Sequence, residues 1–595
     1  MSAYAGPRGL LEIDLSTQTW HRTELDDDVF ADALGGVTLA VRLIEERVHG
    51  PLDPLGPENP IVFAAGPFAS TPVPAANKHA LATISPLTGF LNEGLSSSHF
   101  SAVLRRCGLA AMVITGTAPL WTLLVIDADG VRFTDASPLL GLSARETTKA
   151  VREGLGDRSA RVSAVGRAGE SGVRFASVEN DGRQAGRGGT GAVFGAKRLK
   201  AVALRGRGEV RIADPARTAQ ITQRLRERAA GPATAKYRVL GTGANLRVLQ
   251  RMGQLPTRNF TSAQFDGAEA VTPERARESG GYLELRAGCA GCPVQCEHLY
   301  VRKDRDRRKA GASEYESVWA FGPNCGVSDL DAVLDAVAQC DTLGLDTISS
   351  GSAIAFAMEC AENGLMPRDA FGPPLAFGSA AVLQPALDAI SSRTGWGDIL
   401  ADGVRRAAER IGGAAPSFAM HAKGLELPGY EPRALPTYAL GLAVCTRGAC
   451  HNRAATYDRD LRDPSAAPDD AERAVQAVEA EDRAAVWDAL VLCKFIRDCF
   501  DDVEVEGAEL WSAVTGLALD AQGIRDAVAR AWRRKRAINA RLGWTAADDV
   551  LPPRLFTGIA DGALAGASVD AAALAGQREF YESVRSAQGS PSAVA

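Results

Sequence analysis

The sequence has no long hydrophobic run and no segment typical of export. Nowhere in its 595 residues do about 18 apolar residues follow one another, as a membrane span requires. The opening stretch, MSAYAGPRGLLEIDL, lacks the apolar core of a signal peptide. We therefore expect a cytoplasmic protein without membrane insertion.

Positive charge is not in excess either. The formal net charge is −6, whereas binding to phosphate backbones needs a surplus of clustered Lys and Arg. One basic run, residues 302–309, is interleaved with aspartates, which is typical of a solvated loop. The charge pattern argues against nucleic acid as a partner.

A disulfide framework is a third feature that the sequence does not favour. The chain has 11 cysteines, an odd number, and no secretion signal. Such a set fits reduced thiols and metal ligands better than paired disulfides.

The chain is too long for one compact core, which predicts two to four domains. Up to about residue 208, short apolar runs closed by Gly and Pro predict strands. These runs are residues 10–20, 59–67, 108–116 and 121–126, and the last of them, followed by DADG, predicts one arm of a hairpin.

Beyond residue 208 the periodicity becomes helical. Asp214 is the expected cap of the first helix. Apolar residues three and four apart predict amphipathic helices over residues 329–343, 379–391, 399–411 and 524–541. A break at residues 412–417 (GGAAPS) divides this part. The predicted fold is α+β, with a β-rich domain over residues 1–208 and two mainly helical domains over residues 209–415 and 416–595.

The sharpest local pattern is C-x2-C-x3-C, formed by Cys289, Cys292 and Cys296. Thiolates at this spacing can converge on one metal or cluster, and the flanking Gly288 and Gly291 let the backbone turn closely around it. An iron–sulfur cluster would take a fourth ligand from elsewhere. The candidates are Cys493 and Cys499, followed by Cys325, Cys340, Cys445 and Cys450.

Three other interpretations compete with a cluster. A zinc ion could use the three cysteines and His298, although a histidine two residues after Cys296 is awkward for the same ion. A thioredoxin-like redox pair would need a βαβ setting that the sequence lacks. The spacing could also arise by chance. Spacing alone favours a cluster and does not decide the matter.

Six further strings stand out along the chain. They are SPLTG at residues 85–89, AGRGGTGAVFGAKRLKAVALRG at 185–206, EYESVWAFGPNCG at 314–326, CDTLGLDTISSG at 340–351, KGLELPGYEPR at 423–433 and RGACH at 447–451. In this order, and with the cysteine pattern among them, they resemble the tungsten-containing aldehyde:ferredoxin oxidoreductase family. Weaker likeness extends over residues 11–556.

The resemblance implies a three-domain fold whose β-rich first domain forms the base for a metal held by two pyranopterin dithiolenes. It implies tungsten or molybdenum as that metal, a magnesium ion bridging the pterin phosphates, and one 4Fe-4S cluster. Cys289, Cys292 and Cys296 match the first three cluster ligands, and Cys493 matches the fourth.

The resemblance also assigns the cofactor-binding positions. One pterin motif runs from Asp341 through Gly344 and Leu345 to Asp346, and the other begins at Asp488 and includes Leu492. The phosphates are expected at the glycine-rich segment with its basic neighbours, which are Lys78, Arg183, Ala185, Gly186, Arg187 and Gly188. Glu314 and His451 match the two polar residues that the family places beside the metal.

The sequence departs from the family pattern at several places. Val491 stands where the second pterin motif usually has Gly, and Ser96, Ser97 and Ser98 replace part of a glycine-containing string. Lys78 takes the place of an Arg, which keeps the charge but loses the planar fork. The aromatic-rich closing segment of the family is also absent.

The activity that the resemblance implies is oxidation of an aldehyde to its carboxylate. His451 would polarise the carbonyl and Glu314 would act as general base. Electrons would leave through the cluster to ferredoxin or a small iron–sulfur subunit, in a homo- or hetero-oligomer. Two alternatives stay open: the catalytic subunit of a tungsten-dependent aryl-coenzyme A reductase, and a pterin-free iron–sulfur electron carrier.

Overall fold

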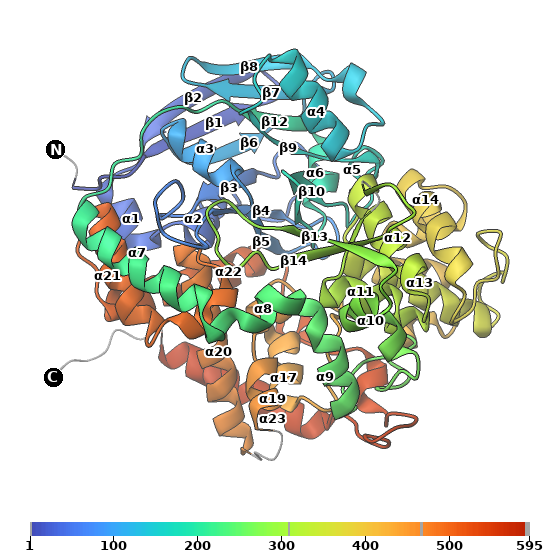
Figure 1. Cartoon of the computed structure of the whole chain (residues 1–595). Coiled ribbons are helices and arrows are strands. Elements are labelled where there is room, and N and C mark those ends of the chain that lie inside the picture. Colours follow the sequence, from blue (N-terminus) through green and yellow to red (C-terminus); the bar gives the residue numbers. More distant parts are fainter. Residues whose placement is uncertain (1–2, 308–309, 464–467, 589–595) are drawn as a thin grey trace.

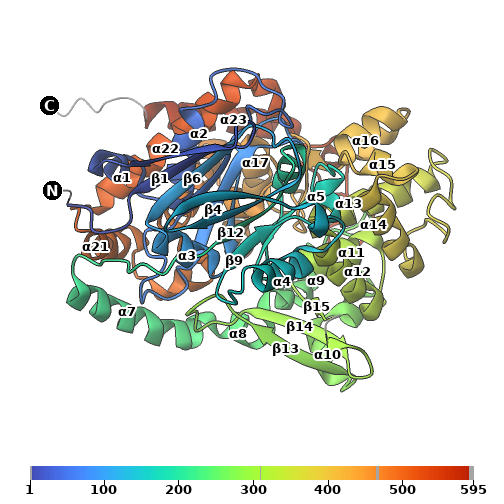
Figure 2. The ribbon, with the colours of Figure 1, turned by 90° about the horizontal axis from the view of Figure 1, so that it is seen from above.

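The computed structural model describes residues 3–307, 310–463 and 468–588 (Figure 1). Two six-stranded sheets form the N-terminal part of the chain, which Figure 2 shows from above. Helices surround them on the remaining sides. The expected α+β fold with a β-rich first part is thereby confirmed.

The first sheet has the order β2-β1-β6-β3-β4-β5. Its strands are β1 (Gly9–Asp14), β2 (Thr19–Glu24), β3 (Ile61–Ala65), β4 (Lys78–Ile84), β5 (Leu91–Ser97) and β6 (Leu109–Thr115). Only β1 and β6 run parallel. Every residue of β3 is buried, because this strand is central and covered on both faces. The edge strand β2 is exposed throughout.

The second sheet has the order β11-β10-β9-β12-β7-β8. Its strands are β7 (Thr122–Asp127), β8 (Gly130–Asp135), β9 (Arg161–Ala164), β10 (Val178–Asn180), β11 (Arg183–Ala185) and β12 (Leu199–Leu204). The predicted hairpin is confirmed, since β7 and β8 pair antiparallel across DADG. One apolar layer joins the two sheets and includes Phe63 and Met112 from the first with Leu124 and Val202 from the second.

Helices form where the sequence shows helical periodicity. The observed elements are α7 (Pro215–Ala230), α12 (Leu330–Leu343), α14 (Leu383–Ser392), α16 (Val404–Ile411) and α22 (Ala521–Arg541). Asp214 caps α7 by accepting a hydrogen bond from the Arg217 amide at 2.9 Å. The stretch predicted as one helix over residues 399–411 is divided, because Gly403 adopts φ +82° between α15 (Trp396–Leu400) and α16.

The C-x2-C-x3-C pattern lies in a loop between two strands. β13 (Tyr282–Ala287), β14 (Glu297–Arg302) and β15 (Gly311–Ala312) form a three-stranded sheet, and residues 288–296 connect the first two. The basic run that follows is solvated up to residue 307, with Arg302 paired to Asp304 and Asp331. Residues 308–309 of that run lie outside the described residues.

Buried apolar residues from both sides of residue 415 belong to one cluster, whose members range from Leu87 to Tyr581. A second cluster joins α2 (Gly36–Glu45) to α22 and to the end of α20 (Asp470–Leu490). The division of the helical part at residue 415 stays a prediction. Within the described ranges, no helix combines the length and apolarity that crossing a bilayer requires.

Candidate functional site

The structure brings the four predicted cluster cysteines together around one lysine. Lys78 opens β4, and burial disfavours its charge. Negative charge on the sulfurs of Cys493, Cys289 and Cys296, together with a hydrogen bond to Cys493, outweighs this effect and raises the Lys78 pKa. Burial, reinforced by the nearby Cys493 and Cys289, raises the pKa of Cys292 to about 11. Two segments 200 residues apart therefore present thiols to one place.

Main-chain contacts hold both cysteine segments against the first sheet. The Cys493 amide donates to the Ala75 carbonyl at 3.0 Å. The Asn77 side chain donates to the Ala290 carbonyl at 2.9 Å. All four cysteines are half-buried and none forms a disulfide. Ala75, Asn77 and Lys78, which lie just before and at the start of β4, thus support the cysteine loop. We call these three residues the platform.

The geometry does not support a zinc site with His298. Its Nδ1 lies 2.7 Å from Glu284 and its Nε2 lies 3.1 Å from the Tyr237 carbonyl, so both ring nitrogens are engaged. Among the described residues, no three His, Cys, Asp or Glu side chains converge closely enough for a single metal ion. A four-iron cluster is larger than an ion and takes one thiolate per iron, so its ligands stand further apart.

The two predicted pterin motifs share one backbone design. In the first, α12 ends at Gly344 with φ +76°, and Leu345 follows, buried. In the second, α20 ends at Val491 with φ +55°, and Leu492 follows, buried. In both, the amide of the leucine returns to a carbonyl five residues earlier, which closes the helix end. Each motif thereby places its first aspartate in the last turn of a helix.

Asp341 of the first motif lies among other carboxyl groups. Burial, reinforced by Glu179, Glu314 and Glu297, raises its pKa to about 7. Gln184 donates a hydrogen bond to it at 3.3 Å. Asp346 instead caps α13 (Thr347–Glu362) by accepting from the Ser349 amide and hydroxyl. A group with several N–H donors, such as a pterin ring, would fit the Asp341 end of this motif.

The glycine-rich segment, residues 185–189, is fixed from several sides. Gly188 has φ +90°, and a Cβ there would lie 2.1 Å from the Asn92 side chain. Arg187 donates to the Ala449 and Glu426 carbonyls at 2.6 and 2.5 Å, which ties the segment to RGACH. Arg183 lies 2.8 Å from Glu297, and Ala185 is buried beside the half-buried Gly186. Arg187 therefore positions the loop that carries His451.

Asp488 of the second motif belongs to a buried group of charges. It lies 3.1 Å from Arg453 and 3.4 Å from Lys494. Arg453 also donates to Glu93 at 3.0 Å, and Lys535 donates to Glu93 at 2.8 Å.

Cations outnumber carboxylates in this group, which suits an anionic cofactor. Glu93, Arg453, Lys494 and Lys535 are not among the site residues that the sequence predicts. Arg453 and Lys494 stand two and one residues beyond His451 and Cys493, and proximity to predicted site residues was the only available signal.

A glutamate outside the predicted site residues faces His451. Glu316 Oε1 lies 3.4 Å from His451 Nδ1, while Glu316 Oε2 accepts from the Gly429 amide at 2.9 Å. Burial raises the Glu316 pKa to about 7. Burial, reinforced by the nearby Arg187, lowers the His451 pKa to about 3. The pair therefore combines a carboxyl group that titrates near neutrality with an uncharged imidazole.

Glu314, which was expected beside the metal together with His451, faces a different group of residues. It precedes α11 (Tyr315–Phe321) as its exposed cap position, and its charge acts on Asp341, Cys296 and Glu297. Residues two apart at a helix start point in different directions, so Glu314 and Glu316 face different groups. The string EYES contains both, and only the direction of α11 distinguishes them.

Several buried polar atoms around this pair accept or donate no hydrogen bond within the described part of the chain. They are Glu316 Oε1, His451 Nδ1, the Tyr438 hydroxyl and Arg187 Nε. Unpaired buried polar groups are rare in proteins, and a cluster of them indicates a bound polar group. The donor set fits the expected cofactor, with four thiols on one side, cations beside Asp488, and carboxyl groups beside Asp341.

The chain matches the family models for the aldehyde ferredoxin oxidoreductase N-terminal domain over residues 10–206 and for domains 2 and 3 over residues 218–592. It is 34% identical to the tungsten-containing aldehyde ferredoxin oxidoreductase of Pyrococcus furiosus, over 92% of this chain and 91% of that protein. The corresponding protein of Thermococcus kodakarensis is 33% identical, over 92% and 90%.

A solved structure shares the fold at lower identity. It is the active site complex BamBC of benzoyl coenzyme A reductase with 1,5-dienoyl-CoA, with a TM-score of 0.82 and 23% identity over 98% of this chain and 94% of that one. The two family models together cover almost the whole sequence, and so does each of the two relatives. The chain belongs to the aldehyde ferredoxin oxidoreductase family.

Proposed function

We propose that this chain oxidises aldehydes to carboxylates and passes the electrons to a ferredoxin or a small iron–sulfur subunit. The observation that carries the proposal is the Glu316–His451 pair, buried beside the cofactor-binding residues. The overall conversion takes one water and releases two electrons and three protons. When bound, a tungsten held by two pterin dithiolenes supplies the two-electron acceptor.

The chain's own residues would accept and donate the protons of the reaction. With a pKa of about 7, the Glu316 carboxylate is matched to removing a proton from the water that attacks the aldehyde carbon. The Asn452 side-chain nitrogen, a donor, lies 3.0 Å from His451 Nε2, and this contact would leave the imidazole proton on Nδ1. That N–H can donate to the aldehyde oxygen while charge develops on it.

The four cysteines would hold a 4Fe-4S cluster, with Lys78 compensating their negative charge. Asp341, Asp346 and Asp488 would orient the pterins by accepting from ring N–H groups. Arg453 and Lys494, which contact Asp488, would neutralise phosphate charge there. Magnesium as a bridge between phosphates would belong to the same region.

Metal analysis of anaerobically purified protein, combined with a dye-linked aldehyde assay, tests the proposal. We expect one tungsten and about four irons per chain, with turnover of an aldehyde and none of benzoyl-coenzyme A. Reduction of the thioester without aldehyde turnover would favour the aryl-coenzyme A reductase alternative. Iron without tungsten or pterin would leave an electron carrier and remove the catalytic role of Glu316.

A further inference from the structure

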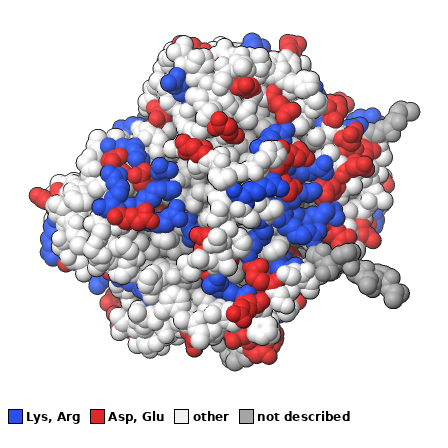
Figure 3. Space-filling model, turned by 180° about the vertical axis from the view of Figure 1, so that it is seen from behind, with Lys and Arg blue, Asp and Glu red and all other residues white. Residues whose placement is uncertain are grey.

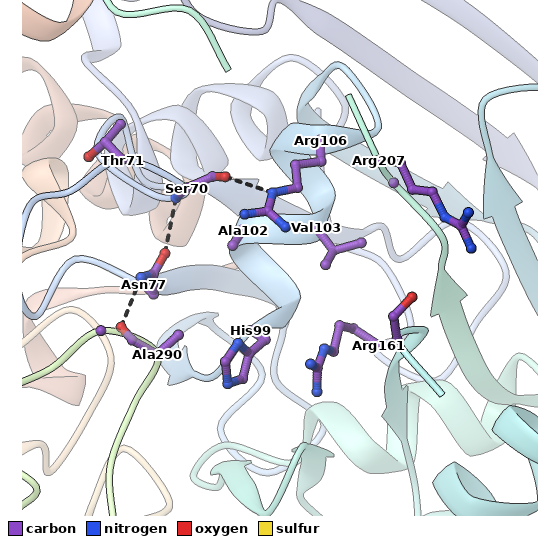
Figure 4. Close-up of a pocket in the computed structure, with 13 residues that line it drawn as sticks. Ser70, Thr71, Asn77, His99, Ala102, Val103, Arg106, Arg161, Arg207 and Ala290 are labelled. Carbon is purple, nitrogen blue, oxygen red and sulfur yellow. Dashed lines mark hydrogen bonds between the residues drawn. The ribbon is translucent and has the colours of Figure 1, made fainter. Parts of the chain in front are cut away.

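A cleft with a volume of about 410 Å³ opens directly beside the cysteine loop (Figure 4). The β-rich part of the chain forms most of its wall, through α3 (Phe100–Arg106), the start of β9 and the segment after β12. Ala290 and Gly291, which lie between Cys289 and Cys292, complete the lining. The cleft therefore joins the predicted cluster site to the surface of a different part of the fold.

The charge of this cleft has one sign. Arg106, Arg161 and Arg207 line it, and the described lining residues include no carboxylate. His99 also lines it, but burial lowers its pKa, so it adds no charge near neutral pH. Arg207 has 79% of its side chain exposed, and Arg106 is exposed as well. This concentration of positive charge stands out in a chain whose formal net charge is −6.

A second hollow, of about 930 Å³, adjoins the first and shares His99 and Arg161 with it. Its further basic side chains come from α4 (Ala144–Gly154) and the loop after it: Arg145, Lys149, Arg152 and Arg158. The acidic side chains there are Glu153, Glu179 and Asp181. Asp181 is paired with Arg152 and Arg161, and Glu153 lies 3.9 Å from Lys149. The two hollows thus form one continuous surface with a surplus of positive charge, which we call the basic cleft.

Basic side chains elsewhere are differently arranged. On the face seen from behind, acidic side chains lie between the Lys and Arg groups (Figure 3). Ion pairing of this kind is also present on α22, where Arg530 and Arg534 both lie 2.8 Å from Asp32. The basic cleft contains ion pairs too, among them Arg207 with Asp157 at 3.7 Å. Its described lining nevertheless holds seven Lys and Arg side chains and three carboxylates, so a net positive field remains.

A chain of hydrogen bonds connects the basic cleft with the cysteine loop (Figure 4). Arg106 donates to the Ser70 hydroxyl at 3.0 Å, and the Ser70 amide donates to Asn77 at 3.0 Å. Asn77 in turn donates to the Ala290 carbonyl at 2.9 Å. A partner that contacts Arg106 would therefore rest on the platform that supports the cysteines.

The cysteine loop is also accessible at this point. Gly288 and Gly291 are exposed, while the Glu316 and His451 side chains are only 16% and 15% exposed. Aldehyde oxidation releases two electrons, and a one-electron carrier accepts one at a time, so two oxidised carriers must dock in each turnover. The electrons then reduce two ferric ions of these carriers, and the protons leave to solvent.

We propose that the basic cleft docks a small acidic electron-transfer protein that carries an iron–sulfur cluster. The inference rests on the proposed function, since it names the partner of the same site. Complementary charge steers such encounters and raises their rate, and the exposed arginines suit carboxylates on the partner. The positive surface extends over two hollows and several elements, which favours a protein surface over a single small anion.

The test uses the complete metal-loaded chain and an oxidised, acidic bacterial-type ferredoxin as the probe. The double variant Arg106→Glu, Arg207→Glu reverses two exposed charges of the basic cleft. Arg251→Glu, Arg525→Glu is the matched control, with both charges on the remote helices α9 (Asn245–Met252) and α22. We expect the first variant to raise the Kd for ferredoxin about tenfold or more and to weaken its salt dependence, and the control to change neither.

A separate readout distinguishes this inference from the proposed function. Oxidation of aldehyde with a small viologen dye needs no docked protein, so its rate should stay the same in both variants. If the cleft variant loses ferredoxin binding and the unmodified chain oxidises no aldehyde, the docking surface is retained and the proposed function is rejected. Unchanged ferredoxin affinity in the cleft variant would overturn the docking surface.

Two further measurements make the result decisive. Lys149→Glu, Arg158→Glu alters the adjoining hollow away from the cysteine loop, so weaker ferredoxin binding there supports the surface even if the first variant folds poorly. Titration with inorganic phosphate tests a small-anion pocket. Phosphate binding that depends on Arg106 and Arg207, with ferredoxin binding intact, would overturn the proposal.

Discussion

Glu316 Oε1 and His451 Nδ1 lie 3.4 Å apart, each in the first turn of a helix. The two residues reach this position from segments 135 positions apart, because Glu316 also accepts from the Gly429 amide and Arg187 holds the loop before His451. Their pKa values, about 7 and about 3, imply that the imidazole is neutral at physiological pH. The relationship is therefore that of a base and a neutral donor, and not an ion pair.

This relationship predicts the pH dependence of aldehyde oxidation. Glu316 must be ionised to accept a proton, and burial raises its pKa to about 7. We expect kcat/KM to fall as the pH decreases through about 7, and to level off above it. His451 takes up a proton only near pH 3 and should add no inflection in this range. A profile of kcat/KM that stays flat between pH 5.5 and 8 would contradict the assignment.

Replacing each of the two neighbouring glutamates separates their roles. Glu316→Gln should lower kcat by roughly 10²–10⁴-fold, the range typical of a lost general base. Glu314→Gln, at the exposed cap position, is the matched control and should change kcat only slightly. Tungsten and iron content, measured on both variants, should equal the wild-type values. Equal losses in the two variants would show that the pair with His451 is not the source of the effect.

The lysine within the cysteine group should tune the cluster. Lys78→Met removes a positive charge from beside Cys493, Cys289 and Cys296. Adding an electron to the cluster then becomes less favourable, so its midpoint potential should move to a more negative value. Lys78→Arg keeps the charge and serves as the control. The potential is measured by redox titration followed by EPR spectroscopy, and an unchanged midpoint in Lys78→Met would exclude an electrostatic role.

How much the sequence predicts depends on the range of the interaction. Strand and helix periodicity, the Asp214 cap and the DADG hairpin are local, and the structure confirms them. The choice between Glu314 and Glu316 depends on the direction of one helix relative to RGACH, which no local pattern contains. The Glu93–Arg453 contact joins residues 360 positions apart, so it could not be predicted from spacing.

Val491 illustrates a different limit of sequence reasoning. Its replacement of the usual glycine predicts reduced room for the second pterin motif, yet the residue adopts φ +55° and closes α20 as Gly344 closes α12. A β-branched residue in this region is strained by about 1–2 kcal/mol. The structure accommodates its side chain against two glycines, Gly36 and Gly66.

This packing predicts a coupled pair of substitutions. In Gly66→Ala, the added Cβ would lie 2.7 Å from Val491 Cβ, so the variant should lose about 1–3 kcal/mol through overpacking. Gly50→Ala is the matched control, because a Cβ there meets nothing within 4 Å. Thermal unfolding midpoints of the complete chain measure both, and we expect only Gly66→Ala to lower the midpoint.

The double variant Gly66→Ala, Val491→Gly tests whether the two positions constrain each other. Val491→Gly alone relieves the backbone strain but leaves a cavity where a fully buried side chain was, so it should also be destabilising. In the double variant the new methyl group partly occupies that cavity. Its midpoint should therefore lie above the value expected from adding the two single effects. Strict additivity would mean that Val491 and Gly66 do not constrain each other, and that the αL position of Val491 is maintained by α20 alone.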